Sequence, residues 1–367
     1  MKRINPIIQW WMTPKFPLIH LKDNTSCAKK WFFHPLKRRL ARLYLKFLQK
    51  FTDIKIIVIT GSAGKTTTKE MLASILKADK STVYSKENID PVYNIPTTIL
   101  KTSFGTKYLI LETGVEYPGE MDFYLWLAKP DIGVITNIFP THLEFLENVK
   151  GVLNEKSKLV LGLSKDNIAI LNAGDAKLKD TSKDIKAKIV WFEENENPIL
   201  QNSLAAEAVA KSLGVSADKI RKGLAVYQKP KHRFSLINLK SGATILDDSY
   251  NSNPQALSSI LKYFIGKSGR NNKIAVLGDM KELGEFEERY HRDMGREISK
   301  LNFKAVIGVG EAIKYLIEEI GSNTKTYIVK NQEAALPLLR PYLQKGNCIL
   351  IKGSRSIGLD KLVDALV

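Results

Sequence analysis

Residues 59–72, with the sequence ITGSAGKTTTKEML, carry the side chains with the clearest chemical potential in this chain. Small residues from Gly61 to Gly64 allow backbone N–H groups to turn toward an anion at the start of a helix, where the helix dipole favours negative charge. Lys65 has the spacing to reach the β- and γ-phosphates of a nucleotide, and the hydroxyl of Thr66 is a ligand for Mg²⁺. The segment therefore predicts a nucleotide phosphate site.

The match to a phosphate loop is partial. The complete pattern places its first glycine at position 59, where this chain has isoleucine. An ordinary turn between a strand and a helix is the competing interpretation. Glycine, lysine and two threonines directly after a buried strand favour nucleotide binding, but they leave the reaction open.

Two polar side chains follow apolar runs further along the chain. Glu112 closes the run YLILE, and His142 comes shortly after the run DIGVITNI. Parallel strands place ligand-binding residues at their carboxyl ends, so Glu112 is expected to face the loop across a sheet. A single histidine is more often structural than a metal ligand, but its position beside these strand ends favours a functional role for His142.

A mostly parallel sheet is the element that must position these residues. Residues 54–60 are short and β-branched, as in a strand buried on both faces, and residues 66–77 have apolar side chains at helical spacing. Strand-like and helical stretches alternate to residue 170, and a second alternating series begins near residue 234. We expect an α/β fold, with a phosphate-loop-containing central domain followed by a Rossmann-like C-terminal α/β domain.

Domain boundaries follow from composition. We expect a basic, aromatic leader over residues 1–53, an ATP-binding domain over 54–230 and a C-terminal domain over 231–367, with a proline and the basic segment KPKHR at the second boundary. Two distant cysteines form no disulfide or metal pattern. No apolar run approaches the roughly 18 residues that span a membrane. These features predict a cytoplasmic protein.

The leader concentrates positive charge. The chain has a net charge of +18, and residues 1–55 hold 13 Lys and Arg against 2 Asp and Glu, a net +11. A helical pattern places one set of side chains on an apolar face and another on the opposite, basic face: Leu36, Leu40, Leu43, Tyr44 and Phe47 against Arg38, Arg39, Arg42, Lys46 and Lys50. Such a helix can dock on the next domain with its basic face in water, lie on an anionic membrane at the inner face, or meet nucleic acid. Nucleic acid is the least expected partner.

Several blocks of the sequence together resemble the Mur ligase family. These are ITGSAGKTTTKEML, LETGVEYPGEMD, KPDIGVITNIFPTHLE, LDDSYNSNP, VLGDMKELGEFEERYH and ILIKGSRS, which run in the family's order from about residue 54 to the C-terminus. They are most similar to the branch that adds D-alanyl-D-alanine to UDP-N-acetylmuramoyl-tripeptide. The resemblance implies an ATP- and Mg²⁺-dependent amide ligase of peptidoglycan precursor and cell-wall synthesis, which forms an acyl phosphate that the amine of the dipeptide attacks.

The resemblance also implies roles for individual residues. It implies catalytic roles for Lys65, Glu112, His142, Lys156 and Arg233, and metal binding by Thr66, Glu112, His142 and a carbamylated Lys156. It implies ATP binding by Gly61, Ser62, Ala63, Gly64, Lys65, Thr66, Thr67, Asn202, Arg233, Asp248, Tyr250, Asn251 and Asn253. For the amine substrate, it implies Asp279, Lys281, His291, Lys352, Ser354 and Arg355.

The chain departs from the family pattern in three places. Members of the family carry an N-terminal domain that binds the UDP end of the acceptor, whereas only the leader precedes the phosphate loop here, and the insert before Asn202 is short. Asp90 and Pro91 stand where the family has paired asparagines, and Pro198 and Ile199 where it has histidine and asparagine. Recognition of UDP is therefore open. A ligase for a different carboxylate acceptor, and a non-catalytic ATP-binding partner of another ligase, remain the alternative functions.

Overall fold

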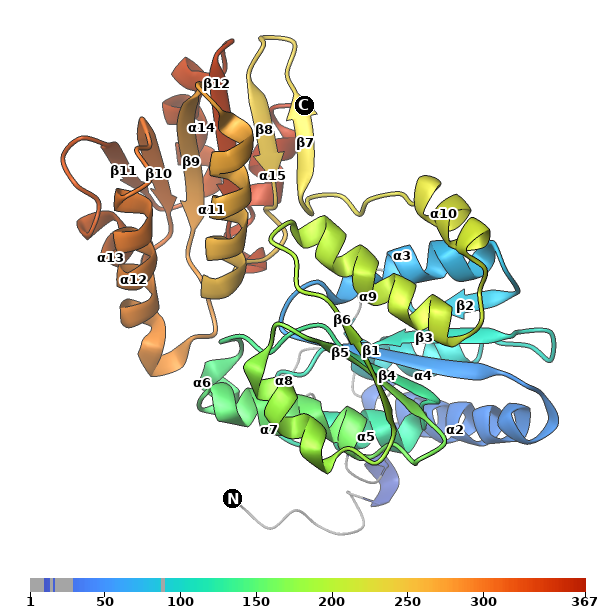
Figure 1. Cartoon of the computed structure of the whole chain (residues 1–367). Helices are drawn as coiled ribbons and strands as arrows, with labels where there is room; N and C mark the ends of the chain where they lie inside the picture. Colours follow the sequence, from blue (N-terminus) through green and yellow to red (C-terminus); the bar gives the residue numbers. More distant parts are fainter. Residues whose placement is uncertain (1–9, 14–15, 17–28, 87–89) are drawn as a thin grey trace. The chain divides into compact units, whose positions relative to one another are not determined.

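The computed structural model describes residues 10–13, 16, 29–86 and 90–367 (Figure 1). The chain forms two compact units. The first comprises the described residues up to Phe139, together with Asn148–Asn195 and Leu200–Gln228, and the second comprises Pro140–Glu147, Glu196–Ile199 and Lys229–Val367.

The first unit is built on a six-stranded sheet in the order β2-β3-β1-β4-β5-β6, and every pair of neighbours is parallel. The strands are β1 (Lys55–Thr60), β2 (Thr82–Tyr84), β3 (Tyr108–Glu112), β4 (Ile132–Ile135), β5 (Ile168–Asn172) and β6 (Lys188–Phe192). The side chains of Ile56 to Ile59 are buried on both faces of β1, which is why this run has no alternation of polar residues.

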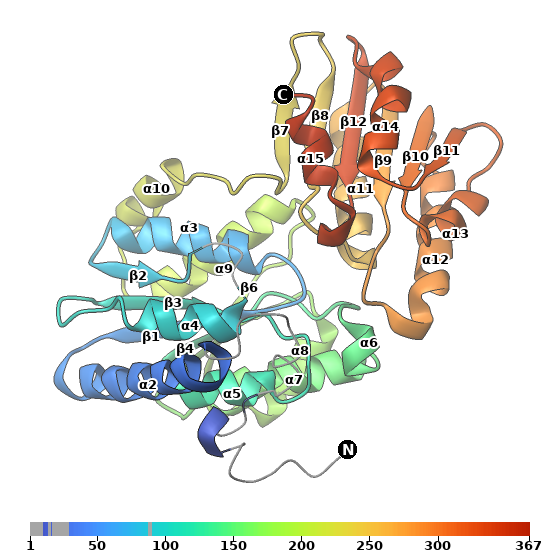
Figure 2. The ribbon, with the colours of Figure 1, turned by 180° about the vertical axis from the view of Figure 1, so that it is seen from behind.

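Helices cover both faces of this sheet (Figures 1 and 2). They are η2 (Lys29–Phe33), α2 (His34–Phe51), α3 (Lys65–Lys77), α4 (Pro91–Ile99), α5 (Glu120–Leu127), α7 (Val149–Leu161), α8 (Ala176–Thr181), η3 (Ser182–Asp184), α9 (Pro198–Ser212) and α10 (Ala217–Ala225). Helix α3 packs on β1 and β3 beside α10, whereas α2 packs on α4 and α5. Helix α2 is thus an outer layer over other helices.

The second unit contains a mixed six-stranded sheet in the order β11-β10-β9-β12-β8-β7, in which only β7 is antiparallel to its neighbour. Its strands are β7 (Ser235–Asn238), β8 (Thr244–Asp247), β9 (Asn272–Gly278), β10 (Ala305–Val309), β11 (Lys325–Val329) and β12 (Asn347–Lys352). Its helices are α6 (Leu143–Leu146), α11 (Pro254–Ser268), η4 (Gly284–Phe286), α12 (Glu287–Ser299), α13 (Ile313–Glu318), α14 (Gln332–Leu339), η5 (Arg340–Tyr342), η6 (Arg355–Ile357) and α15 (Leu359–Asp364). Branched side chains from the central strands, including Ile274, Ile307 and Ile349, form its core.

The predicted fold class is confirmed. A parallel sheet with a glycine loop after its central strand β1 is followed by a second α/β sheet, as the two alternating series indicated. Strands β3 and β4 flank β1, so the ends of three neighbouring strands meet beside the loop.

Helix α2 docks by the face opposite to its apolar one. Its buried side chains include Arg38, Ala41, Leu45 and Leu48, whereas four of the five residues of the predicted apolar face are exposed: Leu36, Leu40, Leu43 and Phe47. The guanidinium of Arg38 lies 3.6 Å from the centre of the Phe16 ring, a cation–π contact inside the protein. Burial lowers the pKa of Arg38 to about 9. In the described part of the chain, no helix combines the length and the apolar character needed to cross a bilayer.

Candidate active site

The loop between β1 and α3 depends on two glycines. Gly61 and Gly64 have φ angles of 150° and 79°. A Cβ atom on Gly61 would lie 1.9 Å from Thr136 Oγ1, and one on Gly64 would lie 2.2 Å from Asn202 Oδ1. Only glycine fits at these positions, because the backbone there approaches two side chains that come from far along the chain.

The end of strand β4 braces the loop from one side. Asn137 Oδ1 accepts the N–H of Ala63 at 2.8 Å, and the carbonyl of Asn137 accepts the N–H of Ser62 at 3.1 Å. Thr136 Oγ1 donates to the carbonyl of Ala63 at 2.6 Å. The N–H groups of Ser62 and Ala63, which were predicted to face a phosphate, therefore already have partners in the segment that follows β4.

The start of helix α3 offers the anion-binding groups. Gly64 is the residue before the helix, and no side chain of the described residues caps it. The first backbone N–H groups of a helix have no partner within the helix, and the helix dipole adds partial positive charge there. Lys65 Nζ donates to the carbonyl of Gly61 at 2.9 Å, which holds the ammonium over the loop. This end of α3 is suited to a phosphate group.

Thr66 and Glu112 meet beside the loop. Thr66 Oγ1 donates to Glu112 Oε1 at 2.7 Å, and the backbone N–H of Glu112 donates to Ser85 Oγ at 2.9 Å. A hydroxyl and a carboxylate at one point are oxygen ligands of the kind that Mg²⁺ prefers, so this part of the predicted metal set fits the ion.

Lys69 is a charged neighbour of this pair that was not predicted from the sequence. Its side chain is fully buried, and Nζ lies 3.3 Å from Glu112 Oε2 and 3.0 Å from Glu70 Oε1. Its spacing in the sequence could have indicated this position, because a residue three positions after Thr66 lies on the same face of the helix. Lys69 neutralises part of the charge of Glu112 and keeps its second oxygen in place.

Lys156 is a buried ammonium without a partner. It lies on helix α7 with no exposed surface, and no group of the described residues forms a hydrogen bond with its Nζ. Burial, helped by the positive charge of Lys65, lowers the pKa of Lys156 to about 7. A buried cation that pairs with nothing is costly, so this position suits a lysine that is neutral or carries another group.

The acidic residues around Lys156 are held by other groups. Glu155 accepts the N–H groups of Gly119 and Met121, both at 3.0 Å, and pairs with Lys158 at 2.6 Å. These contacts fix the loop before α5 to helix α7. They also keep the Glu155 carboxylate turned toward partners other than Lys156.

Asn202 packs on the phosphate loop. Its Oδ1 faces the backbone of Gly64 and accepts from Thr68 Oγ1 at 3.3 Å. The side chain is buried, on helix α9. Asn202, which was predicted to lie near the nucleotide base, therefore also shapes the phosphate loop.

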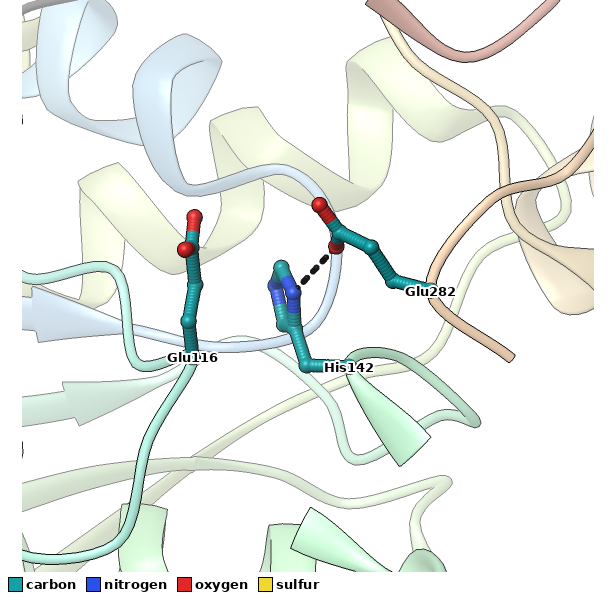
Figure 3. Close-up of side chains that lie close together, drawn as sticks. All are labelled: Glu116, His142 and Glu282. Carbon is teal, nitrogen blue, oxygen red and sulfur yellow. Dashed lines mark ion pairs between the residues drawn. The ribbon is translucent and has the colours of Figure 1, made fainter. Parts of the chain in front are cut away.

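His142 belongs to the second unit. It has a φ of 54° at the start of α6, and its Nδ1 lies 2.5 Å from Glu282 Oε2 (Figure 3). The N–H of Glu144 donates to the carbonyl of Glu282 at 3.3 Å, so backbone and side-chain contacts join the same two segments. Glu116, the third side chain drawn in Figure 3, belongs to the first unit. Of the predicted metal ligands, Thr66 and Glu112 therefore contact each other within the first unit, whereas His142 contacts Glu282 within the second unit.

Arg233 stands in a strained turn of the second unit. Its neighbours His232 and Phe234 have φ angles of 59° and 50°. The N–H of Phe234 donates to Asp248 Oδ1 at 3.0 Å, and the guanidinium of Arg233 lies 4.0 Å from the centre of the Tyr250 ring. Such strain persists where surrounding contacts enforce it, often at binding sites.

The neighbouring predicted residues join this turn. Lys352 Nζ pairs with Asp248 Oδ2 at 2.5 Å and donates to the carbonyl of Asn251 at 2.8 Å. The guanidinium of Arg355 lies 5.0 Å from the centre of the Tyr250 ring, which Arg233 also contacts. The predicted nucleotide and amine residues here form one basic cluster around Tyr250.

Other residues of the predicted site form hydrogen bonds that hold the backbone in place. Asn253 caps helix α11 by accepting the N–H of Ala256 at 2.8 Å. Asp279 is buried, accepts the N–H of Ile313 at 2.7 Å, and pairs with Lys281 at 2.8 Å. The N–H of Lys281 donates to Ser354 Oγ at 2.9 Å.

His291 has no exposed surface. Its Nε2 accepts the N–H of Met280 at 3.0 Å, and its Nδ1 lies 2.7 Å from the carbonyl of Glu287. Nδ1 therefore carries the proton, and burial lowers the pKa of this imidazole. Both ring nitrogens are used by backbone groups, which gives His291 a structural place in this unit.

The two substituted pairs both begin helices. Asp90 caps α4 by accepting the N–H of Val92 at 2.9 Å, and Pro91 follows as the first helical residue. Pro198 likewise opens α9, with Ile199 in its first turn. These departures from the family pattern are thus compatible with the local fold.

Two family models match the chain in sequence. The Mur ligase middle domain matches residues 59–235, and the Mur ligase glutamate ligase domain matches residues 232–355. The UDP-N-acetylmuramoyl-tripeptide--D-alanyl-D-alanine ligase of Buchnera aphidicola is 31% identical, over 86% of this chain and 76% of that protein. The enzyme of the same name from Bacillus subtilis is 29% identical, over 96% of this chain and 82% of its own length.

Solved structures give the same result. MurF from Acinetobacter baumannii superposes with a TM-score of 0.80 at 26% identity, covering 90% of this chain and 80% of that one. MurF from Thermotoga maritima, solved in complex with ADP, has a TM-score of 0.79 at 24% identity, covering 94% of this chain and 87% of its own, and is similar in fold.

Proposed function

This chain belongs to the Mur ligase family of ATP-dependent amide ligases, and from this we propose that it adds D-alanyl-D-alanine to a UDP-N-acetylmuramoyl-tripeptide-like acceptor. The observation that supports ligase chemistry is the buried, unpartnered ammonium of Lys156 in the same unit as the glycine loop, whereas the acceptor and the dipeptide are taken from the names of the relatives. A phosphate loop occurs in many nucleotide-binding proteins, whereas an isolated buried cation needs a chemical reason.

In the proposed reaction, the terminal carboxylate of the acceptor peptide attacks the γ-phosphorus of ATP, and ADP leaves. The amine of D-alanyl-D-alanine then attacks the acyl carbon, loses a proton, and expels inorganic phosphate as the amide forms. Activation is required because a carboxylate is a poor electrophile. The protein's contribution is alignment and neutralisation of the charge on the transferring phosphoryl group.

Lys65 and the start of α3 hold the phosphates in this proposal. The ammonium lies over the loop through its bond to Gly61, so it can turn to the β- and γ-phosphates without rebuilding the backbone. The backbone amides at the beginning of α3 face the same anion. We assign to Arg233 the role of a second phosphate-binding cation, since its planar guanidinium suits phosphate oxygens and Tyr250 supports it.

Thr66 and Glu112 fit Mg²⁺ as oxygen ligands, and the family places a histidine at the position of His142 in the same metal set. When bound, Mg²⁺ neutralises phosphate charge and orients the phosphate oxygens. Lys69 fixes the second oxygen of Glu112 and so limits the directions in which this carboxylate can point.

We assign Lys156 as the carbamylated residue. A lysine must lose its proton before it can react with carbon dioxide, and the lowered pKa of Lys156 makes the neutral amine abundant near pH 7. The resulting carbamate replaces a buried, unpartnered cation with an anion that can serve as an oxygen ligand. This change reverses the sign of the charge, so the positive charge of Lys65, which disfavours the ammonium, favours the carbamate.

Phosphate release with defined acceptors tests the function. We expect phosphate release that requires both UDP-N-acetylmuramoyl-tripeptide and D-alanyl-D-alanine, with a product heavier by the dipeptide residue in mass spectrometry. Turnover with another carboxylate acceptor alone would contradict the acceptor assignment but keep the ligase. Absence of turnover with every acceptor, while nucleotide still binds, would favour a non-catalytic ATP-binding partner.

A further inference from the structure

Helix α2 exposes an apolar stripe, formed by Leu36, Leu40, Leu43 and Phe47. These side chains are 55%, 59%, 66% and 47% exposed. They follow each other at spacings of four, three and four residues, so they lie along one face of the helix. The docking face of α2 is a different one, formed by Arg38, Ala41, Leu45 and Leu48. The stripe therefore takes no part in packing α2 on its neighbours.

Other aromatic side chains extend the stripe. Phe47 contacts Phe51 and Phe104 with ring centres 4.7 and 5.7 Å apart, and both of these rings are exposed. Trp10 is 66% exposed and is held beside α2 by Arg39, which donates to its carbonyl. Nine of the sixteen large exposed hydrophobic side chains among the described residues belong to this surface: Trp10, Phe32, Phe33, Leu36, Leu40, Leu43, Phe47, Phe51 and Phe104. A cluster of exposed apolar side chains is typical of a surface that a membrane or another protein covers.

The charges at the edge of the stripe have one sign. Arg39, Lys46 and Lys50 flank it on one side of the helix. Residues 29–51 contain no aspartate or glutamate. Protein–protein interfaces are depleted in lysine, whereas helices that lie in a bilayer surface combine an apolar face with lysine and arginine beside it. The composition favours a lipid surface over a protein partner.

We propose that helix α2 is a membrane-surface anchor, whose apolar stripe inserts among the lipids of an anionic bilayer while its basic edge meets the headgroups. The docking contacts keep α2 against the first unit: Tyr44 donates to the carbonyl of Thr102 at 2.7 Å, and Lys37 donates to Thr97 Oγ1 at 2.7 Å. At 1.5 Å per residue, its 18 residues present an edge about 27 Å long to the bilayer. The anchor lies in the plane of the surface and is independent of the ligase proposal.

Flotation of the full chain with vesicles tests the apolar part of the anchor. We expect the chain to float with vesicles of phosphatidylcholine mixed with phosphatidylglycerol, and more weakly with phosphatidylcholine alone. Leu43→Asp should reduce partition by at least about tenfold, because the stripe then places a charge among lipid chains. Val226→Asp is the matched control, since Val226 is 69% exposed after helix α10 and outside the stripe.

Charge reversal tests the basic part. Each cation near an anionic surface contributes about fivefold, so Lys46→Glu with Lys50→Glu should weaken partition by at least about thirtyfold, and raised salt should weaken the wild type. Lys179→Glu with Lys186→Glu makes the same change of charge at exposed lysines away from α2. All variants are expected to keep the wild-type melting temperature, because every replaced side chain is exposed.

Two results would overturn the proposal. Equal flotation of the wild type and Leu43→Asp would remove the role of the stripe in lipid binding. A chain that does not float but self-associates in sedimentation equilibrium, with Leu43→Asp abolishing the association, would make this face a protein interface.

Discussion

Replacing Lys156 with methionine should stabilise the fold while it destroys the ligase. Methionine has a similar length and can fill the same space in α7 without a charge. The ammonium it replaces has no exposed surface and no hydrogen-bond partner among the described residues. The two properties, stability and activity, should therefore move in opposite directions.

The size of the effect follows from the pKa of Lys156, which burial lowers from 10.5 to about 7. One pKa unit corresponds to about 1.4 kcal/mol, so the folded state at pH 7 loses about 4 kcal/mol relative to an unperturbed lysine. Between pH 7 and pH 10.5 the unfolded chain binds more protons at this residue than the folded chain. Wild-type stability should therefore rise with pH in this window, by roughly 2 kcal/mol from pH 7 to pH 9. Below pH 7 both states are protonated, and the full penalty remains.

Urea denaturation measures this difference. Wild type and Lys156→Met are compared in buffers free of carbon dioxide and Mg²⁺, from pH 6 to pH 9. The variant should be more stable at pH 6 and pH 7, and its advantage should shrink toward pH 9. Lys150→Met, at an exposed position of the same helix, is the control and should change stability by less than about 0.5 kcal/mol. A variant no more stable than the wild type, or an advantage independent of pH, would refute an unpartnered buried cation at this position.

The remaining predictions concern the loop and the carbamate. Lys65→Ala should lower ATP turnover by at least about a hundredfold in a phosphate-release assay, with an unchanged melting temperature, whereas Lys77→Ala at the exposed end of α3 should leave turnover intact. Wild-type turnover in Lys65→Ala would contradict the phosphate assignment. Gly64→Ala should destabilise the fold by about 1–2 kcal/mol from its positive φ alone, and should also abolish ADP binding in calorimetry, because its Cβ would meet Asn202. Gly214→Ala, with a similar φ of 75° and open space around it, should show the first effect without the second. Lys156→Ala should lose activity and recover part of it with added formate or acetate, but not with chloride at equal ionic strength. Recovery with chloride would argue against a missing carboxylate-like ligand.

The central fold could be predicted because its signals are local. The buried run before Gly61 forms β1, and Glu112 ends the strand beside it. The loop and the strand ends could be placed from the sequence because parallel strands, short turns and glycines each have a characteristic pattern. The contact between Thr66 and Glu112 follows from that topology.

The environments of charged side chains could not be predicted in the same way. Periodicity assigned Leu40 and Leu43 to one face of α2, but it cannot tell which face packs on a neighbour. Ala41 allows close approach on the other face, and Arg38 is accommodated there by aromatic rings. Lys156 likewise cannot be distinguished from the other lysines in the sequence, because its burial depends on the fold.

The amine-substrate residues show a related difficulty. Asp279 directly follows the glycine that ends β9, a position typical of ligand contacts, and His291 lies on α12. In the structure both are buried, and their polar atoms bind backbone N–H and carbonyl groups. Polar residues at strand ends serve either role, and the hydrogen bonds that decide between them come from segments distant in sequence.

The bracing of the phosphate loop by remote residues has a consequence for synthesis of the chain. The loop binds Asn137 and Phe139 across 74 and 77 residues, and Thr68 binds Asn202 across 134. A growing chain on the ribosome therefore possesses β1 and α3 long before it possesses the groups that fix Gly64. Contacts of such long range form late, since the intervening chain must first be closed into a loop. We expect nascent chains to lack affinity for nucleotide when residue 160 has emerged from the ribosome but residue 210 has not. The chain length at which ADP binding first appears would therefore report when α9 docks during translation.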